Sequence, residues 1–179
     1  MTAVKVRGFT LLEVMVVIVV IGIIATFAVV QIPANDPAER VYAEARRLAA
    51  IMRQQWEEAV LLGQQRGIRV QHNAYTALVL SRDNKKWLSG EALTDESGST
   101  LPSRQLGDSF DLELVVEGRP IELKPVTGQT TGAGQPQILF LSSGELTEFE
   151  LTLANRSAER TAYRLHGSIN GAIELIALP

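Results

Sequence analysis

The apolar positions of the chain follow three patterns in succession, and the first is a long apolar run at the N-terminal end. In residues 9–30 the only charged residue is Glu13. A helix over this run would be about 33 Å long, enough to cross the hydrocarbon core of a bilayer. Its many β-branched residues would favour a strand in water, but a lone strand in lipid leaves its backbone groups unsatisfied. We therefore predict a transmembrane helix over residues 9–32, with a break near Pro33, because proline disfavours helix at the residue before it.

The second pattern predicts an amphipathic helix over residues 36–62. Asp36 suits the N-cap position and Pro37 the first helical position, while Glu39 completes a capping box. Gly63 is a residue type that commonly ends helices. We therefore expect a helix of about seven turns that begins shortly after the predicted membrane segment.

This helix carries one apolar stripe. Its members recur at spacings of three and four: Val41, Ala45, Leu48, Met52, Trp56, Ala59 and Leu62. Four polar residues are predicted to lie mostly outside the stripe: Glu44, Arg47, Gln54 and Glu58. The spacing predicts that the stripe packs on a sheet of the same chain. Packing against neighbouring subunits is the alternative.

The third pattern, from residue 64 to residue 179, has the period of two that is typical of strands. Strands are predicted at 67–72 and 75–81, joined by a turn at Asn73, with a short strand around Trp87. Three hairpins are expected: 110–125 turning at Glu117–Arg119, 137–153 turning at Ser142–Gly144, and 161–178 with a type I′ turn at Asn170-Gly171. Residues 89–108 and 127–135 are expected to be loops. The predicted fold class is α+β, a long N-terminal helix packed on an antiparallel sheet or sandwich.

Composition narrows the chemistry that the chain can carry. The formal net charge is −3, from 17 basic and 20 acidic residues, so the chain lacks the basic excess that is typical of nucleic-acid-binding proteins. The absence of cysteine excludes disulfides and thiolate sites, and two histidines make a multi-histidine metal site unfavourable. No arrangement of His72 or His166 with Ser and Asp suggests a triad, so both are expected to be structural or surface residues. We expect no enzyme and no cofactor.

The flanks of the apolar run predict its orientation. Lys5 and Arg7 precede it and no basic residue follows until Arg40, so the N-terminus is expected in the cytoplasm. A cleaved secretory signal is the alternative, but its apolar region is usually about 7–15 residues long. A plain anchor does not explain Glu13, because a carboxylate in the membrane costs roughly 2.5–3.5 kcal/mol even on insertion scales.

The residues around Glu13 resemble a known signal. Gly8 and Phe9, followed by Thr-Leu-Leu-Glu13 and the apolar run, are similar to the class III signal of type IV pilins and type II secretion pseudopilins. The resemblance implies a leader peptide of residues 1–8, cleavage between Gly8 and Phe9 by a prepilin peptidase, and N-methylation of Phe9. It further implies assembly into a filament, with Glu13 neutralising the Phe9 ammonium of a neighbouring subunit.

The remaining chain resembles the H-type minor pseudopilins of type II secretion. The similarity rests on "FLSSGELTEFELTL" (140–153), on "RLHGSINGAIEL" (164–175) and on the position of Trp87. It implies a periplasmic helix over residues 33–63, a β domain over 64–179, and a single-pass inner-membrane protein. Implied partners are the other minor pseudopilins, the major pseudopilin, the prepilin peptidase and, as a further class, secreted proteins. Pilin-like stalks often carry a proline about three residues earlier than Pro33.

Three alternatives are weaker. A type IV minor pilin that captures DNA would need a basic face, and Arg156, Arg160 and Arg164 are interrupted by Glu159. An anchored periplasmic enzyme lacks a catalytic constellation. The segment 94–99 offers carboxylates for calcium, but without the spacing of a known calcium loop. The sequon at Asn155 is attributed to chance.

Overall fold

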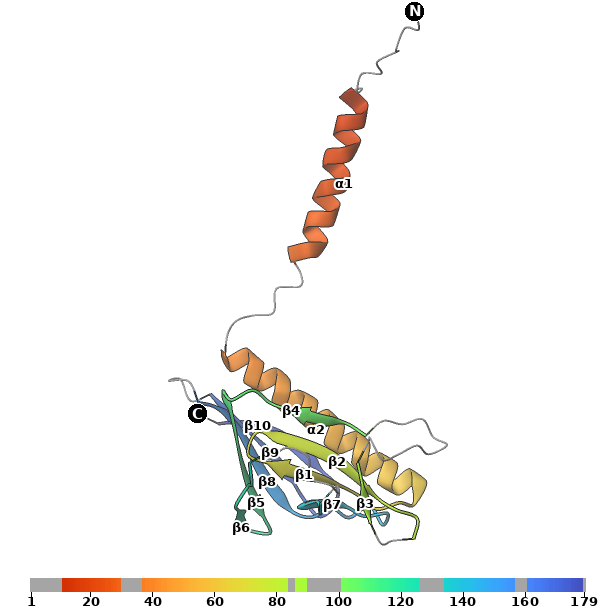
Figure 1. The fold of residues 1–179 in the computed structure, drawn as a ribbon, viewed down its shortest axis with the longest axis vertical. Helices are drawn as coiled ribbons and strands as arrows, with labels where there is room; N and C mark the ends of the chain where they lie inside the picture. The colour runs from red at the N-terminus through yellow and green to blue at the C-terminus, as the bar shows by residue number, and fades with distance from the viewer. Residues whose placement is uncertain are drawn as a thin grey trace, which may run out of the picture. The chain divides into compact units, whose positions relative to one another are not determined.

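The structure is a computed structural model that describes residues 11–29, 37–83, 86–89, 101–125, 134–156 and 161–178. The chain divides into two compact units, Met1–Asn35 and Asp36–Pro179, and each is described by itself (Figure 1). Gly8, Phe9, Pro33 and Asp36 lie outside the described residues, as does the candidate calcium segment 94–99.

The first unit contains one helix, α1, over Leu11–Val29. The predicted membrane span of residues 9–32 extends beyond the described residues at both ends. Across the described part of the chain, no helix meets the length and apolarity needed for a membrane span.

The second unit begins with α2, over Pro37–Leu62. The helix ends as the sequence predicts, because Gly63 adopts a φ of 61° and the amide of Gln64 donates to the carbonyl of Ala59 at 3.1 Å. This bond across the left-handed glycine is the longer hydrogen bond of a Schellman motif, which satisfies a carbonyl that the helix end would leave unpaired.

Two antiparallel sheets follow. In the first sheet the strand order is β3 (Trp87–Leu88), β2 (Ala74–Leu80), β1 (Arg66–Gln71) and β7 (Ile138–Phe140), with β4 (Ser103–Gln105) also paired to β2. In the second sheet the order is β10 (Ile173–Leu178), β9 (Ala162–Gly167), β8 (Phe149–Asn155), β5 (Phe110–Val116) and β6 (Arg119–Ile121). The predicted fold class, a helix packed on antiparallel sheets, is confirmed.

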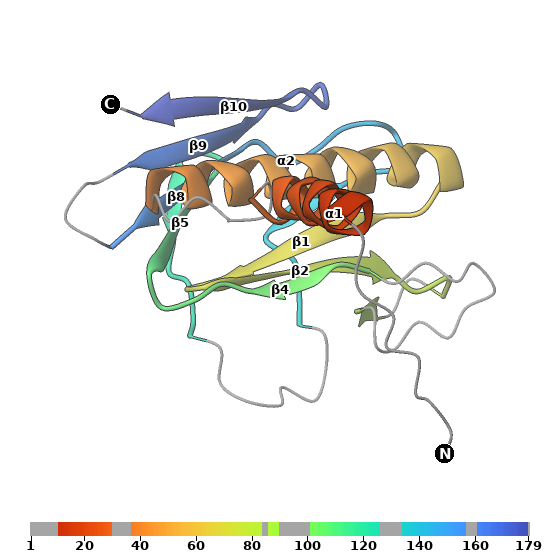
Figure 2. The ribbon, with the colours of Figure 1, turned by 90° about the horizontal axis from the view of Figure 1, so that it is seen from above.

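The helix α2 packs against both sheets, through β1 and β7 of the first and β8, β9 and β10 of the second. In Figure 2, β1 and β2 lie on one side of the helix and β9 and β10 on the other. Its residues Val41, Leu48 and Met52 join one buried cluster with residues of both sheets, including Ile68 and Leu151. The predicted stripe therefore packs on the protein's own sheets. Leu62, its last predicted member, is instead exposed, and Trp56 is half-buried.

The predicted hairpin over residues 137–153 forms only next to its turn, and its two long strands do not pair with each other. The chain does turn at 142–144, and Phe140 and Leu146 form an isolated antiparallel bridge. However, β7 pairs with β1 in the first sheet, whereas β8 pairs with β5 and β9 in the second. This turn is therefore the connection between the two sheets, because its two flanking strands each find another partner.

Two smaller expectations also need correction. Part of the expected loop 89–108 forms β4, and Leu101 and Leu106 on either side of it are buried. The β9–β10 hairpin forms as expected, but it closes through five residues, 168–172. Its turn is not type I′, because Gly171 has a positive φ of 90° while Asn170 does not.

Candidate assembly site

The surface of α1 is apolar on every side. Consecutive residues from Val14 to Ile21 are exposed, and Leu11 and Leu12 are more exposed still. A soluble helix normally confines such residues to one stripe, so a helix that is apolar all round needs an apolar environment such as lipid or other helices. The described side chains of α1 therefore require an apolar environment around the helix.

Glu13 stands in the first turn of α1 and is exposed. This position suits a carboxylate, because the N-terminus of a helix carries a partial positive charge. Of the three sequence-predicted site residues, only Glu13 belongs to the described residues. The cleavage and methylation positions, Gly8 and Phe9, lie outside the described residues and therefore stay predictions.

A polar cluster that the sequence analysis missed lies on α2. Glu44 is 6% exposed, and its Oε1 accepts a hydrogen bond from the Tyr75 hydroxyl at 2.8 Å. The same oxygen lies 2.8 Å from Nε of Arg104. Burial, together with the hydrogen bond to Glu44, raises the pKa of Tyr75 well above its usual range. The cluster thus joins α2, β2 and β4 through one carboxylate.

The spacing of Glu44 was the signal that could have found this cluster. Glu44 lies three residues after Val41 and four before Leu48, so it is on the buried face of the helix. A polar residue on an apolar face implies a buried partner, because an unpaired buried charge is costly.

A second buried polar group joins α2 to β1. Arg66 is 5% exposed, and its Nη1 lies 3.0 Å from Oε1 of Gln55 and 2.5 Å from Oε2 of Glu58. This arrangement positions the first strand against the helix. Gln55 lies three residues after Met52 and four before Ala59, so it is a polar residue on the buried face of the helix.

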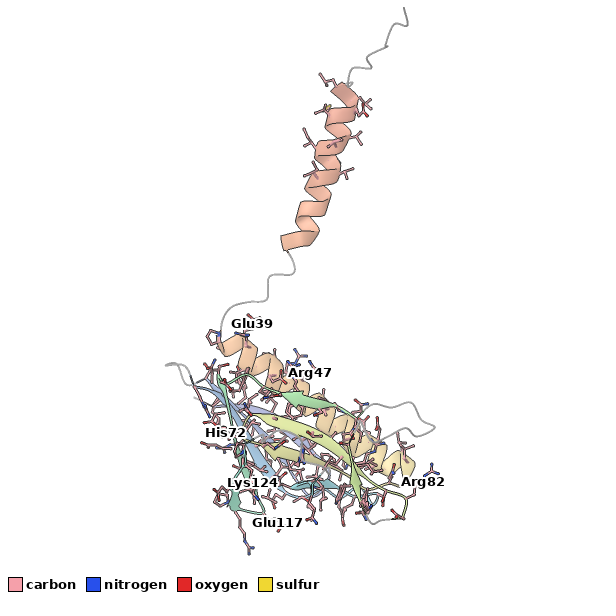
Figure 3. All side chains as sticks on the ribbon, viewed as in Figure 1. Glu39, Arg47, His72, Arg82, Glu117 and Lys124 are labelled. Atoms are coloured by element: carbon pink, nitrogen blue, oxygen red, sulfur yellow. The ribbon has the colours of Figure 1, made fainter. Side chains whose placement is uncertain are left out.

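The histidines and the basic C-terminal residues occupy partly exposed positions. His72 follows β1, its amide donates to the carbonyl of Lys124, and its ring lies 3.7 Å from Asp111 (Figure 3). Arg156 contacts His72 and lies 3.5 Å from Asp111. Arg164 pairs with Glu150 at 3.2 Å. Each of these two arginines therefore lies close to a carboxylate.

His166 lies in β9, in register with Glu150 and Glu174. Arg160 lies outside the described residues. Among the residues that the structure describes, no group of three or more His, Cys, Asp or Glu side chains could hold a metal ion. Asn155, the first residue of the sequon, is buried at 8% exposure.

Comparisons with known proteins match both parts of the chain. The family model described as "Type II transport protein GspH" matches residues 44–171, from α2 to the β9–β10 turn. The chain belongs to the GspH family. A second family model, the prokaryotic N-terminal methylation motif, matches residues 4–29 and so spans Gly8, Phe9 and Glu13.

Curated relatives carry the same family name. The type II secretion system protein H of Pseudomonas aeruginosa is 35% identical over 162 residues, covering 89% of each chain. That of Vibrio cholerae is 29% identical and covers 96% of this chain and 94% of its own. The protein is therefore a minor pseudopilin of type II secretion, within a family of structural pseudopilins.

Solved structures agree with the fold. The minor pseudopilin EpsH of the Vibrio cholerae type 2 secretion system has a TM-score of 0.57 at 26% identity, covering 76% of this chain and 96% of its own. The solution structure of Escherichia coli GspH has a TM-score of 0.53 at 21% identity and supports the fold alone.

Proposed function

We propose that this minor pseudopilin links the tip complex of minor pseudopilins to the shaft of major pseudopilins. In this position it serves the export of folded periplasmic proteins across the outer membrane. The observation that carries the proposal is an α1 that is apolar on every side and bears Glu13 in its first turn, in a chain of the GspH family. These two features of α1 are explained better by packing in a bundle of like helices than by a role as a simple membrane anchor.

The proposed maturation creates the partner of Glu13. Cleavage between Gly8 and Phe9 removes the basic leader and leaves an α-amino group on Phe9, which is then N-methylated. In the assembled bundle this ammonium lies against Glu13 of a neighbouring subunit. Two unit charges about 4 Å apart attract by roughly 4 kcal/mol at an effective dielectric of 20. This exceeds the roughly 2.5–3.5 kcal/mol cost of placing the carboxylate in the membrane.

The proposed topology follows from charge. The leader with Lys5 and Arg7 stays in the cytoplasm, the helix crosses the inner membrane once, and the second unit folds in the periplasm. The methylation-motif match over residues 4–29 supports this arrangement, because this region contains the basic leader, the cleavage position and most of the apolar run.

The experiment compares Glu13→Leu with Val17→Leu in the full-length protein, in membranes that contain the other pseudopilins. Val17 is one helical turn away on α1 and is the matched control. We expect both variants to fractionate with membranes. Glu13→Leu should lower the recovery of crosslinked pseudopilins at least about tenfold, a loss of ~1.4 kcal/mol that lies well within the expected attraction. Equal recovery from the two variants would overturn the docking role of Glu13.

A further inference from the structure

Both sheets of the second unit have edge strands, and β10 is the longest of them. The edges of the first sheet are β7 on one side and β3 and β4 on the other, each of two or three residues. The second sheet ends in β6, which has three residues and contains Pro120, and in β10, which has six and forms its outer border in Figure 2. Proteins protect open edges by short strands, proline and lysine, because an open edge pairs with other chains. The strand β10 has none of these protections.

The hydrogen bonds of the second sheet show which backbone groups of β10 point away from β9. Residues that face each other in antiparallel strands alternate between pairs that exchange hydrogen bonds and pairs whose backbone groups point outward. The amide of Ser168 donates to the carbonyl of Ala172 at 3.0 Å, so these two residues form a pair of the first kind. When the register is followed from there along β10, the amides and carbonyls of Ile173, Leu175 and Ala177 point to the open edge.

A side chain of α2 covers one end of this edge. Nη2 of Arg53 donates to the carbonyl of Ile173 at 2.7 Å, which agrees with the outward direction of that carbonyl and leaves it satisfied. The outward amides and carbonyls of Leu175 and Ala177 have no hydrogen-bond partner within the described chain. The open part of the edge therefore offers two donors and two acceptors.

These groups are complementary to the same groups of a second copy. When two β10 strands lie antiparallel about a two-fold axis, Leu175 of each copy pairs with Ala177 of the other. Each pair exchanges two hydrogen bonds, so every free donor and acceptor of both edges is used. The neighbouring register, which pairs Leu175 with Leu175, places Ala177 opposite Ile173, whose carbonyl Arg53 already occupies. Arg53 thus favours the first register.

The side chains of β10 suit this register as well. Ile176 is 42% exposed in the single chain, and in the pair it lies at the two-fold axis, opposite Ile176 of the second copy. This central pair is not hydrogen-bonded, so its Cα atoms are about 4.5 Å apart and its side chains lie close together. Glu174 of each copy faces Leu178 of the other, and no like charges lie directly opposite each other.

We propose that the open edge of β10 pairs antiparallel with β10 of a second copy of this chain, with Ile176 at the two-fold axis. The two five-stranded sheets then form one continuous sheet across both copies. A contact of this symmetry is complete with two copies. It is therefore separate from the helix contact proposed for α1 and does not rest on it.

Single cysteines in the full-length protein, purified in detergent, test the pairing and its register. The natural chain has no cysteine, so every disulfide reports a contact between two copies. Ile176→Cys should form a disulfide-linked dimer under mild oxidation, because Cα atoms about 4.5 Å apart lie within the range that a disulfide spans. Glu174→Cys is the matched control, since Glu174 is exposed on the same face of the strand. In the proposed register its equivalent in the second copy lies four residues along the strand, about 13 Å away.

The yields of the two cysteine variants decide the outcome. At equal protein concentration, Ile176→Cys should give at least about tenfold more dimer than Glu174→Cys, because only its Cα separation permits the bond. No dimer from Ile176→Cys would overturn the proposal. Equal yields would overturn it too, since they would indicate collision or a contact elsewhere in the chain. Either result leaves the proposed function standing, because that function is tested at Glu13.

A lysine at the centre of the edge gives a second test. Ile176→Lys places two like charges opposite each other at the two-fold axis, whereas Ile169→Lys changes an exposed residue of the β9–β10 turn and is the control. Sedimentation of the full-length protein in detergent should show a dimer dissociation constant raised at least about tenfold by Ile176→Lys and changed within about twofold by Ile169→Lys. Thermal unfolding should show that both variants fold, since both side chains are exposed. An unchanged dissociation constant for Ile176→Lys would contradict the proposal.

Discussion

At the scale of single residues, the sequence alone singled out the charge in the apolar run, Glu13. It did not single out the charge that is buried in the fold, Glu44. Glu13 is conspicuous because it is the only charged residue in the apolar run of residues 9–30. Glu44 is inconspicuous because α2 is rich in charged residues, and its partners Tyr75 and Arg104 are distant in sequence. Spacing alone could place Glu44 on the buried face of α2. Only the fold shows that Tyr75 and Arg104 are the groups that contact its carboxylate.

The hydrogen bond between Tyr75 and Glu44 should contribute measurably to stability. Tyr75→Phe removes the donor to a buried carboxylate, a bond of a kind worth about 1.5–3 kcal/mol. We expect the free energy of unfolding in urea to fall by that amount. Tyr163→Phe is the control, since that half-buried ring stacks on Tyr42, and its loss of a hydroxyl should cost within about 0.5 kcal/mol. Equal losses from the two variants would refute the role assigned to Tyr75.

The raised pKa of Tyr75 predicts a dependence of stability on alkaline pH. Its hydroxyl is stabilised in the protonated form, so the folded protein keeps this proton when the unfolded chain loses it near pH 10. The associated stability is complete below about pH 10 and decreases as pH rises beyond that value, by up to ~1.4 kcal/mol per pH unit. Urea unfolding from pH 8 to pH 11 should show this decrease, and Tyr75→Phe should reduce its slope. An unchanged slope in the variant would assign the effect to other groups.

At the scale of elements, the sequence predicted the helix end and the tight turn correctly, but it did not predict which strands pair. The end of α2 at Gly63 and the hairpin turning at Glu117-Gly118 follow from backbone requirements of two or three residues, and both form. In contrast, the period of two reveals which side chains share a face of a strand but not which strand lies beside it. For this reason β7 and β8 were assigned to one hairpin although they lie in different sheets. The pairing of β4 with β2 depends on residues far apart in sequence and carried no local signal.

The left-handed conformation of Gly63 predicts a specific substitution effect. Gly63→Ala should lower the free energy of unfolding by about 1–2 kcal/mol, because a Cβ disfavours this backbone conformation. The space around the position is open, so the cost is one of backbone strain alone. Gly107 is the matched control, since it is exposed and has no positive φ. Gly107→Ala should leave stability unchanged or slightly raised, and the opposite ranking of the two variants would contradict this account.

At the scale of the whole molecule, the two units have separate physical requirements. The second unit has its own core, in which α2 joins two sheets, and some of its charged residues pair within the chain, as Glu44 does with Arg104 and Glu150 with Arg164. In the first unit the described side chains of α1 are exposed. In the proposed function, lipid and neighbouring helices would cover them. The fold class was predictable from periodicity, the class III signal from the residues around Glu13, and the H-type family from segments 140–153 and 164–175. The division of the strands between two sheets was not predictable, because it is decided by long-range packing.

The central claim is that the chain is matured for assembly, and mass spectrometry of its N-terminus tests this claim most directly. The protein should be purified from cells that express an active prepilin peptidase. The account predicts a mature chain that begins with N-methylated Phe9, whereas Gly8→Ala, which adds a methyl group at the cleavage position, should reduce processing. A chain that still begins at Met1 in such cells would contradict the account.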